Sequence, residues 1–330
     1  MGIIIGTIAQ ALIPSHQTPY THPMTSNAPY IRAPAGDFVL PFDVKDAGVR
    51  GRLVRLDATS ARALSAHALA EPAARVLGEM LALAALLGSA LKLDGRLTAQ
   101  TKSAGPLDLL AADYYGADGG RPKGVRGFAR FAAAPPDTRA SFASLAGAGS
   151  LVITIEPKRG AQMYQGIVAL SPLGLAASAE DYFAQSEQLP TLLRLAAAPL
   201  FTPGTCAPHW RAGGLMLQTT PNAPHTEEDW QRLSLLARTV EDVELVDTSL
   251  AAETLLWRLF NEEEVRVLPA EAIAFRCDCD GERIAAVLRS YSPEERAGLA
   301  DADGAIRARC DFCGAVHEIK DFPHPSTSSG

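Results

Sequence analysis

Hydrophobic and polar positions predict strands and helices in turn along the first two thirds of the chain. Residues 71–91 are apolar nearly all round and Pro72 suits a first helical turn, so a central, mostly buried helix is expected there. A second helix is expected over 179–188, because Pro190 stops it. β-rich stretches, several of them preceded by glycine, predict strands at residues 38–40, 51–56, 96–102, 107–112, 125–131, 151–155 and 165–170. This order lacks a regular βαβ alternation and predicts an α+β fold with a mixed sheet-and-helix core domain at the N-terminal side.

The stretch 226–261 has the period of amphipathic helices. Thr226 is followed by three acidic residues, which is typical of a helix N-terminus. Apolar residues then recur at every third or fourth position, so two amphipathic helices are expected, packed in part on the first region. Farther on, residues 282–291 have a helical pattern, and the capping box of Ser292 and Glu295 predicts another short helix.

The net charge changes sign along the chain and marks a boundary. The first 226 residues carry a formal charge of +4 and the remainder carries −11, which gives −7 for the whole chain. The change falls beside a proline-rich stretch near residue 222. The expected organisation is an extension at 1–36, a core domain at 37–222, a helical linker at 223–270, a small C-terminal domain at 271–321 and a disordered tail at 322–330.

The first residues do not fit a common targeting signal. Residues 1–13 are apolar without an opening Lys or Arg, and five prolines follow by residue 34. The preferred interpretation is a disordered extension, or a start placed upstream of the true one at Met24. A weak signal peptide or a membrane-touching tail is the open alternative.

Composition excludes several classes of protein. With 330 residues, 47% of them hydrophobic and 20% charged, the chain is that of a soluble globular protein with a sizeable core. An acidic balance argues against a nucleic-acid partner. The absence of an 18-residue apolar run argues against a membrane span. No phosphate-binding loop, dinucleotide turn or hydrolase elbow is found, so no nucleotide partner is expected.

Four of the five cysteines form the main candidate site. They lie in two close pairs, C-x-C and C-x-x-C, separated by thirty residues: Cys277, Cys279, Cys310 and Cys313. Residues two apart in a strand point to the same face, and C-x-x-C in a tight turn brings two sulfurs together, with Gly314 fitting the turn. Four thiolates in this arrangement predict a tetrahedral site for one Zn²⁺ ion.

Other interpretations of these cysteines stay open at this point. Four thiolates also suit an iron–sulfur cluster, since spacing alone does not separate the two metals. A thioredoxin-like use of the second pair is less favoured because a second cysteine pair is present. His317 is interpreted as a surface residue, since four cysteines close the metal's coordination shell. Cys206, between two prolines, is interpreted as an inert buried thiol.

A separate hypothesis is that the first region is an enzyme. Acidic and aromatic residues that could be catalytic occur in pairs, but without a matched base or nucleophile such pairs are usually structural, and no enzyme is predicted. The candidates are Asp113, Tyr114, Asp181, Tyr182 and Glu187.

The cysteine pattern and several upstream motifs together resemble one family. The flanking sequences FRCDCD and CDFCG look like the zinc-binding end of the redox-regulated 33 kDa heat-shock chaperonin family. The likeness extends upstream through RGRLVRLD, GPLDLLAADY, VRGFARF, YQGIV, EDYFAQSEQLPT and GGLMLQTTP, and covers about residues 37–321. The first 36 residues and the PSTSSG tail have no counterpart, and Cys206 is not one of the family's redox cysteines.

The resemblance implies an ATP-independent holdase of the cytoplasm. In the reduced state zinc is bound to Cys277, Cys279, Cys310 and Cys313, and the protein is inactive. Oxidation converts Cys277–Cys279 and Cys310–Cys313 into two disulfides, releases the metal and loosens the linker. The active form then binds unfolding client proteins and a second protomer. The alternative hypothesis is a constitutive zinc-ribbon interaction module whose metal never leaves.

Overall fold

The computed structural model describes residues 36–91, 93–131, 140–158, 162–201, 203–205, 207–221 and 226–320. Within this part the chain forms two compact units that divide between Arg276 and Cys277. The expected α+β fold is confirmed. The expected extension, the tail, the boundary near residue 222 and Cys206 lie outside the described residues. The predicted domain limits stay a prediction, although residues 271–275 form strands that pair with the first unit.

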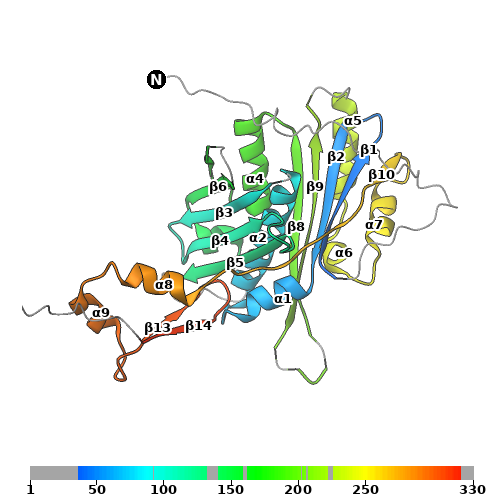
Figure 1. The fold of residues 1–330 in the computed structure, drawn as a ribbon. Coiled ribbons are helices and arrows are strands. Elements are labelled where there is room, and N and C mark those ends of the chain that lie inside the picture. Colours follow the sequence, from blue (N-terminus) through cyan, green and yellow to red (C-terminus); the bar gives the residue numbers. More distant parts are fainter. Residues whose placement is uncertain are drawn as a thin grey trace, which may run out of the picture. The chain divides into compact units, whose positions relative to one another are not determined.

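The first unit contains two six-stranded sheets (Figure 1). One sheet is antiparallel throughout and has the order β10-β1-β2-β9-β8, with β11 also on β1. Its strands are β10 (Val265–Val267), β1 (Phe38–Val44), β2 (Val49–Leu56), β9 (His209–Thr219), β8 (Thr191–Leu200) and β11 (Glu271–Ala272). We call it the first sheet.

The second sheet has the order β12-β5-β4-β3-β6-β7 and is antiparallel except for the parallel pair of β12 and β5. Its strands are β12 (Ala274–Phe275), β5 (Gly124–Phe131), β4 (Leu107–Tyr115), β3 (Gly95–Ser103), β6 (Gly149–Pro157) and β7 (Tyr164–Ala169). All seven strands predicted from the sequence are present as β1 to β7, although β7 ends at Ala169, one residue earlier than predicted.

The helix α2 (Glu71–Ala90) packs against both sheets and lies at the centre of the main hydrophobic core (Figure 1). Sixteen of its twenty residues are buried, which confirms the expected central helix. It is the one helix among the described residues that is long and apolar enough to cross a bilayer, yet 83% of its apolar window is buried in the protein. Small residues permit this packing: a Cβ on Gly78 would lie 2.5 Å from the Cβ of Ala197 on β8.

Shorter helices complete the first unit. They are α1 (Ala58–Ser65), α3 (Phe142–Ala146), α4 (Leu175–Tyr182), α5 (Glu227–Arg238), α6 (Asp242–Val246) and α7 (Ala252–Leu259). The predicted helix at 179–188 begins four residues earlier than expected, and a π-helical turn, Phe183–Glu187, follows Tyr182. Gln188 then takes a left-handed conformation, and Pro190 follows as predicted.

Within its described residues, 226–270, the linker region contains three helices where two were expected. Thr226 caps α5 in a reciprocal box with Asp229, as its acidic first turn predicted. The difference arises after Val240, where Glu241 and Glu244 form a second capping box and begin α6 as a separate helix. The apolar sides of α5, α6 and α7 pack on the face of the first sheet that points away from α2. The rings of Phe42 and Phe260 meet there at a centroid distance of 6.1 Å.

The second unit is small. It contains α8 (Gly281–Leu288), α9 (Pro293–Leu299) and the antiparallel hairpin of β13 (Ile306–Arg309) and β14 (Val316–Ile319). The predicted capping box of Ser292 and Glu295 is present at the start of α9. The hydrophobic cluster of this unit contains only three buried residues in the described part, which are Leu288, Ile306 and Ile319.

Candidate metal centre

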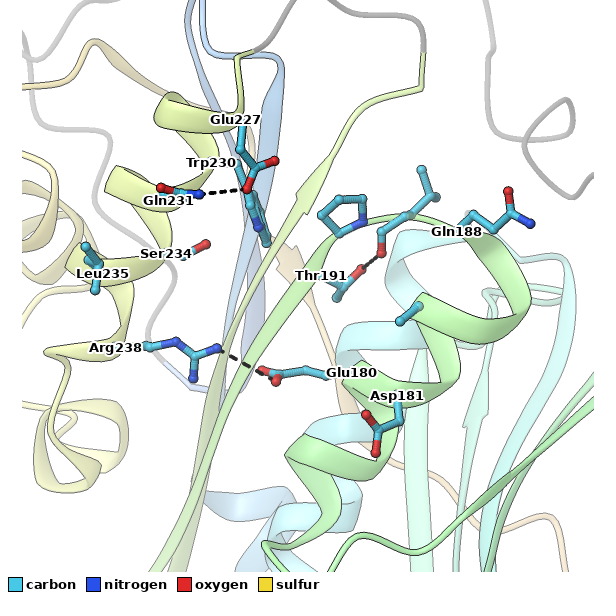
Figure 2. Close-up of a pocket in the computed structure, with 13 residues that line it drawn as sticks. Glu180, Asp181, Gln188, Thr191, Glu227, Trp230, Gln231, Ser234, Leu235 and Arg238 are labelled. Carbon is cyan, nitrogen blue, oxygen red and sulfur yellow. Dashed lines mark hydrogen bonds and ion pairs between the residues drawn. The ribbon is translucent and has the colours of Figure 1, made fainter.

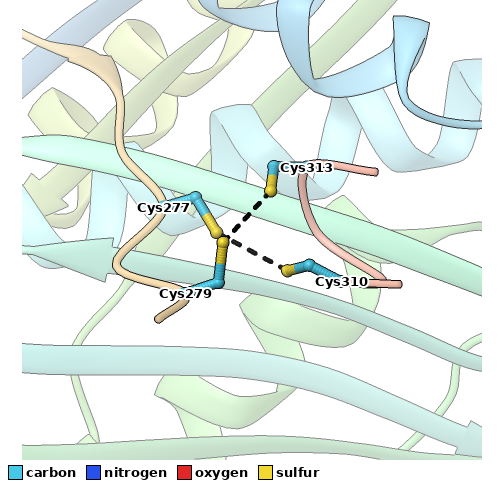
Figure 3. A group of neighbouring side chains, drawn as sticks. All are labelled: Cys277, Cys279, Cys310 and Cys313. Carbon is cyan, nitrogen blue, oxygen red and sulfur yellow. Dashed lines mark hydrogen bonds between the residues drawn. The ribbon is translucent and has the colours of Figure 1, made fainter. Parts of the chain in front are cut away.

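The four cysteines of the second unit meet at one point (Figure 3). Their sulfur atoms all lie within 4.8 Å of one another. The sulfurs of Cys277 and Cys310 are 3.7 Å apart, and those of Cys279 and Cys313 are 3.4 Å apart. Four sulfurs at about 2.3 Å from a tetrahedral zinc ion are about 3.8 Å from one another, so the group can hold such an ion with little adjustment.

The second cysteine pair lies in a tight turn, as predicted. The N–H of Gly314 donates to the carbonyl oxygen of Cys310 at 2.9 Å. The N–H of Cys310 donates to the carbonyl oxygen of Ala315 at 2.8 Å. Gly314 has φ +72°, a left-handed conformation that glycine adopts at low cost. This turn connects β13 to β14 and points both sulfurs toward the first pair.

The expectation that the C-x-C pair lies in a strand is wrong. Strand β12 ends at Phe275, and residues 276–280 have no regular secondary structure. The N–H of Arg276 still donates to the carbonyl oxygen of Val125, after which the chain leaves the sheet. The two sulfurs of this pair nevertheless lie together with those of the second pair.

The thiols have unequal affinities for their protons. Burial and hydrogen bonds to Cys313 and Cys277 raise the pKa of Cys279 well above that of a free thiol. Burial opposes ionisation of Cys313 as well, but a backbone hydrogen bond from Ala315 and the neighbouring thiols outweigh it, so the pKa of Cys313 is lowered. Ionisation is therefore easier at Cys313 than at Cys279, and the thiolate is the form that binds metals and reacts with oxidants.

His317 differs from its expected place at the surface. It lies on β14 opposite Ala308 and is half-buried, with its Nε2 atom buried and without a hydrogen-bond partner in the structure. Neighbouring residues of a strand point to opposite faces, and Val316 and Glu318 are exposed. A strand assigned to this segment of the sequence would therefore have predicted that His317 points inward. Among the described residues, the cluster that could bind a metal ion consists of cysteines and does not include His317.

The candidate catalytic residues have structural partners. Asp113 is 3% exposed, pairs with Arg126 at 2.8 Å and accepts a hydrogen bond from Thr98. Its neighbour Tyr114 points to the opposite side of β4 into the core, where Gly88 lies against its ring. Asp113 and Tyr114 therefore do not meet in one site.

The remaining three candidates lie near the end of α4. Tyr182 is buried, and its hydroxyl and that of Tyr164 each lie 3.4 Å from the same carboxylate oxygen of Glu187. Asp181 instead lines a groove of about 820 Å³ between α4 and α5 (Figure 2). In this groove Arg238 faces Glu180, whose carboxylate also accepts the N–H of Leu193. Glu180 thus contacts both the linker helix α5 and strand β8.

Comparisons with known proteins agree with the arrangement described above. A family model described as "Hsp33 protein" matches residues 37–320. A relative named "33 kDa chaperonin" from Caulobacter vibrioides is 37% identical over 292 residues, which cover 86% of this chain and 94% of the relative. Another of the same name from Vibrio cholerae is 36% identical over 291 residues, covering 87% and 95% of the two chains.

A solved structure shares the fold. The crystal structure of the 33 kDa chaperonin from Thermotoga maritima aligns with a TM-score of 0.70 and 21% identity, covering 86% of this chain and 94% of that one. The match of the family model spans the two sheets, the linker helices and the cysteine cluster. The chain therefore belongs to the Hsp33 family.

Proposed function

We propose that this protein is an ATP-independent holdase chaperone of the cytoplasm, held inactive by zinc and activated by oxidation. The observation that carries the proposal is the cluster of four cysteine sulfurs in a unit whose hydrophobic cluster contains only three buried residues among those described. Family membership supports the chaperone activity, since the relatives are named chaperonins. Its partners are unfolding client proteins and, after oxidation, a second copy of the chain, without nucleotide or nucleic acid.

Zinc is the metal that best fits the site. It would be held by Cys277, Cys279, Cys310 and Cys313, one ion per chain, and would join two segments separated by thirty residues. Structural zinc supplies on the order of 10–16 kcal/mol of binding free energy that counts as folding free energy. A unit with so small a hydrophobic core depends on that contribution.

Oxidation removes the tie between the two segments. In each pair the two sulfurs lose two electrons to an oxidant such as hydrogen peroxide, which is reduced to two molecules of water. The disulfides Cys277–Cys279 and Cys310–Cys313 each close only a short local loop, and their sulfurs are no longer thiolate ligands. The metal leaves, and the second unit loses its fold.

Release of the linker would uncover a large apolar surface. Helices α5, α6 and α7 cover one face of the first sheet, and the buried residues between them form one hydrophobic cluster. On the sheet these include Leu53, Leu215 and Leu217, each fully buried under the helices. Apolar surface of this kind binds unfolded chains without demanding a particular sequence.

The test combines metal release with client protection. Zinc-loaded, reduced protein is treated with hydrogen peroxide while zinc release, free thiols and suppression of aggregation of a chemically unfolded reporter protein are followed together. We expect one zinc ion per chain before oxidation. Peroxide should release this zinc, remove four free thiols and increase the suppression of aggregation, and a thiol reductant should reverse all three changes. A constitutive zinc-binding module would instead keep its metal or show the same suppression before and after oxidation.

A further inference from the structure

One segment of the chain adds strands to both sheets. Residues 264–276, which we call the edge strap, contain β10 and β11 on the edge of β1, and β12 on the edge of β5 (Figure 1). The two edges belong to different sheets, so the edge strap crosses from the first sheet to the second. It begins after α7 and ends at Arg276, directly before the first cysteine of the metal centre.

Main-chain hydrogen bonds hold the edge strap along its whole length. Besides the strand ladders, the N–H of Lys45 donates to Glu264 and that of Leu268 donates to Pro41, both at 2.9 Å. On the other sheet, the N–H groups of Ala274 and Arg276 donate to the carbonyl oxygens of Lys123 and Val125 at 3.1 and 3.0 Å. Bonds of this kind recognise an extended backbone and not a sequence.

Next to the second sheet, two side chains of the edge strap reach the main core, at alternate positions. Ile273 is 5% exposed and belongs to the main core cluster. Phe275 packs against the same cluster, and the guanidinium of Arg62 lies 5.5 Å from its ring centroid. The approach of the backbone is close at Gly124, where an added Cβ would lie 2.5 Å from the Cβ of Arg276 and 2.9 Å from the carbonyl oxygen of Ala274.

Without the edge strap, the edges of β1 and β5 would have no neighbouring strand among the described residues. An unpaired edge is a template for any extended chain. We propose that these two edges bind extended segments of unfolded client proteins by strand addition, with alternate apolar client side chains entering the sites of Ile273 and Phe275. This inference rests on the proposed function, which supplies the event that frees the edges: loss of the folded parts on either side of the edge strap.

The first experiment separates main-chain pairing from hydrophobic contact. Binding of a labelled synthetic peptide with the sequence of residues 264–276 to the full-length chain is measured by fluorescence anisotropy, before and after oxidation with peroxide. One variant peptide is N-methylated at Ala274 and Arg276, whose N–H groups face β5. The matched control is N-methylated at Phe275, which alternates with them and faces away. The attached edge strap competes equally with all three peptides.

We expect binding to the oxidised chain and not to the reduced chain. Loss of two main-chain hydrogen bonds should weaken binding at least about tenfold, while the control should change it less than about twofold. In the full chain, Gly124→Ala should weaken binding of the unmodified peptide several-fold. Gly298→Ala, which has no neighbouring atom within 4 Å of an added Cβ, should leave it unchanged.

Hydrogen exchange of the full chain gives a second measurement with a real client. The amide of Lys45 should be protected in the reduced chain, exchange after oxidation, and become protected again when an unfolded reporter protein binds. Equal binding of the three peptides, with no renewed protection of Lys45, would overturn strand addition even if the oxidised chain suppresses aggregation. An oxidised chain that does not suppress aggregation would overturn the proposed function itself.

Discussion

The guanidinium of Arg55 donates a hydrogen bond to the main-chain carbonyl oxygen of Leu250 and so joins strand β2 to the segment that precedes α7. Its second terminal nitrogen donates to the carbonyl oxygen of Glu244 in α6 at 3.1 Å. Arg55 is only 4% exposed, and burial lowers its pKa, although the nearby Asp247 and Glu253 oppose this. One buried cation thus joins α6 and the segment before α7 to the sheet.

Arg55→Ala should loosen the linker without affecting the metal centre. The substitution leaves two carbonyl oxygens without their donor in a buried place, at a cost of about 2–4 kcal/mol. We expect faster hydrogen exchange over residues 244–250 in the reduced, zinc-bound protein and activation at a lower dose of peroxide. The control is Arg50→Ala on the same strand, an exposed residue whose ion pair with Asp43 is 3.6 Å long. Equal exchange in both variants would contradict this role of Arg55.

Glu79 on α2 should make stability depend on pH. Burial raises the pKa of Glu79 to about 7, with a further contribution from Asp242 on α6. An unfolded chain ionises this carboxyl above about pH 4.5, so between pH 4.5 and 7 the native state binds more protons than the unfolded one. Stability contributed by the protonated group is therefore complete below pH 4.5 and lost as the pH rises through 7.

Glu79→Gln should remove the loss of folding stability that occurs as the pH rises through 7. At pH 8 the variant should be more stable than the parent by about 2–3 kcal/mol, while at pH 4.5 the two should be similar. Urea unfolding of the zinc-loaded protein across this range measures the difference. Glu71→Gln, an exposed carboxylate on the same helix that pairs with Arg75, provides the control. A parallel pH profile for parent and Glu79→Gln would show that the carboxyl does not titrate as stated.

Gly88→Ala should destabilise the first unit although alanine favours helices. An added Cβ would lie 2.1 Å from the ring of Tyr114, which is 1% exposed and cannot move aside. Overpacking of this kind costs about 1–3 kcal/mol, more than the gain of about 1 kcal/mol in helix propensity. Gly298→Ala on α9, where nothing is crowded, should raise local helix stability instead. Thermal unfolding of the two units, followed by separate probes, measures both effects.

Cys310→Ser should unfold the second unit and leave the first unit intact. The variant offers three sulfur ligands in place of four, and the small cluster of Leu288, Ile306 and Ile319 does not replace the lost zinc binding. Limited proteolysis of the reduced protein should cut after Arg276 in the variant much faster than in the parent. Cys206→Ser, which alters the one cysteine outside the cluster, should show the parental pattern. A protected second unit in Cys310→Ser would contradict the dependence on metal.

Where local pattern and tertiary contact agree, the sequence was sufficient. The long apolar run of α2, the capping residues of α5 and α9, and the turn at Cys310 are all defined within a few residues of chain. The cysteine cluster was predictable for the same reason, because ligand type and spacing carry the signal.

Other elements depend on partners far away in the chain. No pattern predicted β8 and β9, which contain runs such as Ala196, Ala197, Gly213 and Gly214 that are poor strand formers. These residues are small because helices lie against both faces of the sheet: a Cβ on Gly214 would be 3.0 Å from Leu86 of α2, and a Cβ on Gly213 would be 2.3 Å from the carbonyl oxygen of Leu245 in α6. The edge strap was missed as well, since its strands are two or three residues long and exist only because β1 and β5 have edges to fill.

The close contact between α2 and the first sheet has a consequence for capture of clients. On the proposed mechanism one face of that sheet loses its helices, while the other remains fastened to α2 through contacts such as Gly78 on Ala197. The first sheet is therefore rigid before a client binds, and almost all the conformational entropy lost on binding is lost by the client. A rigid sheet surface of this kind can bind many different unfolded chains weakly and release each of them still unfolded.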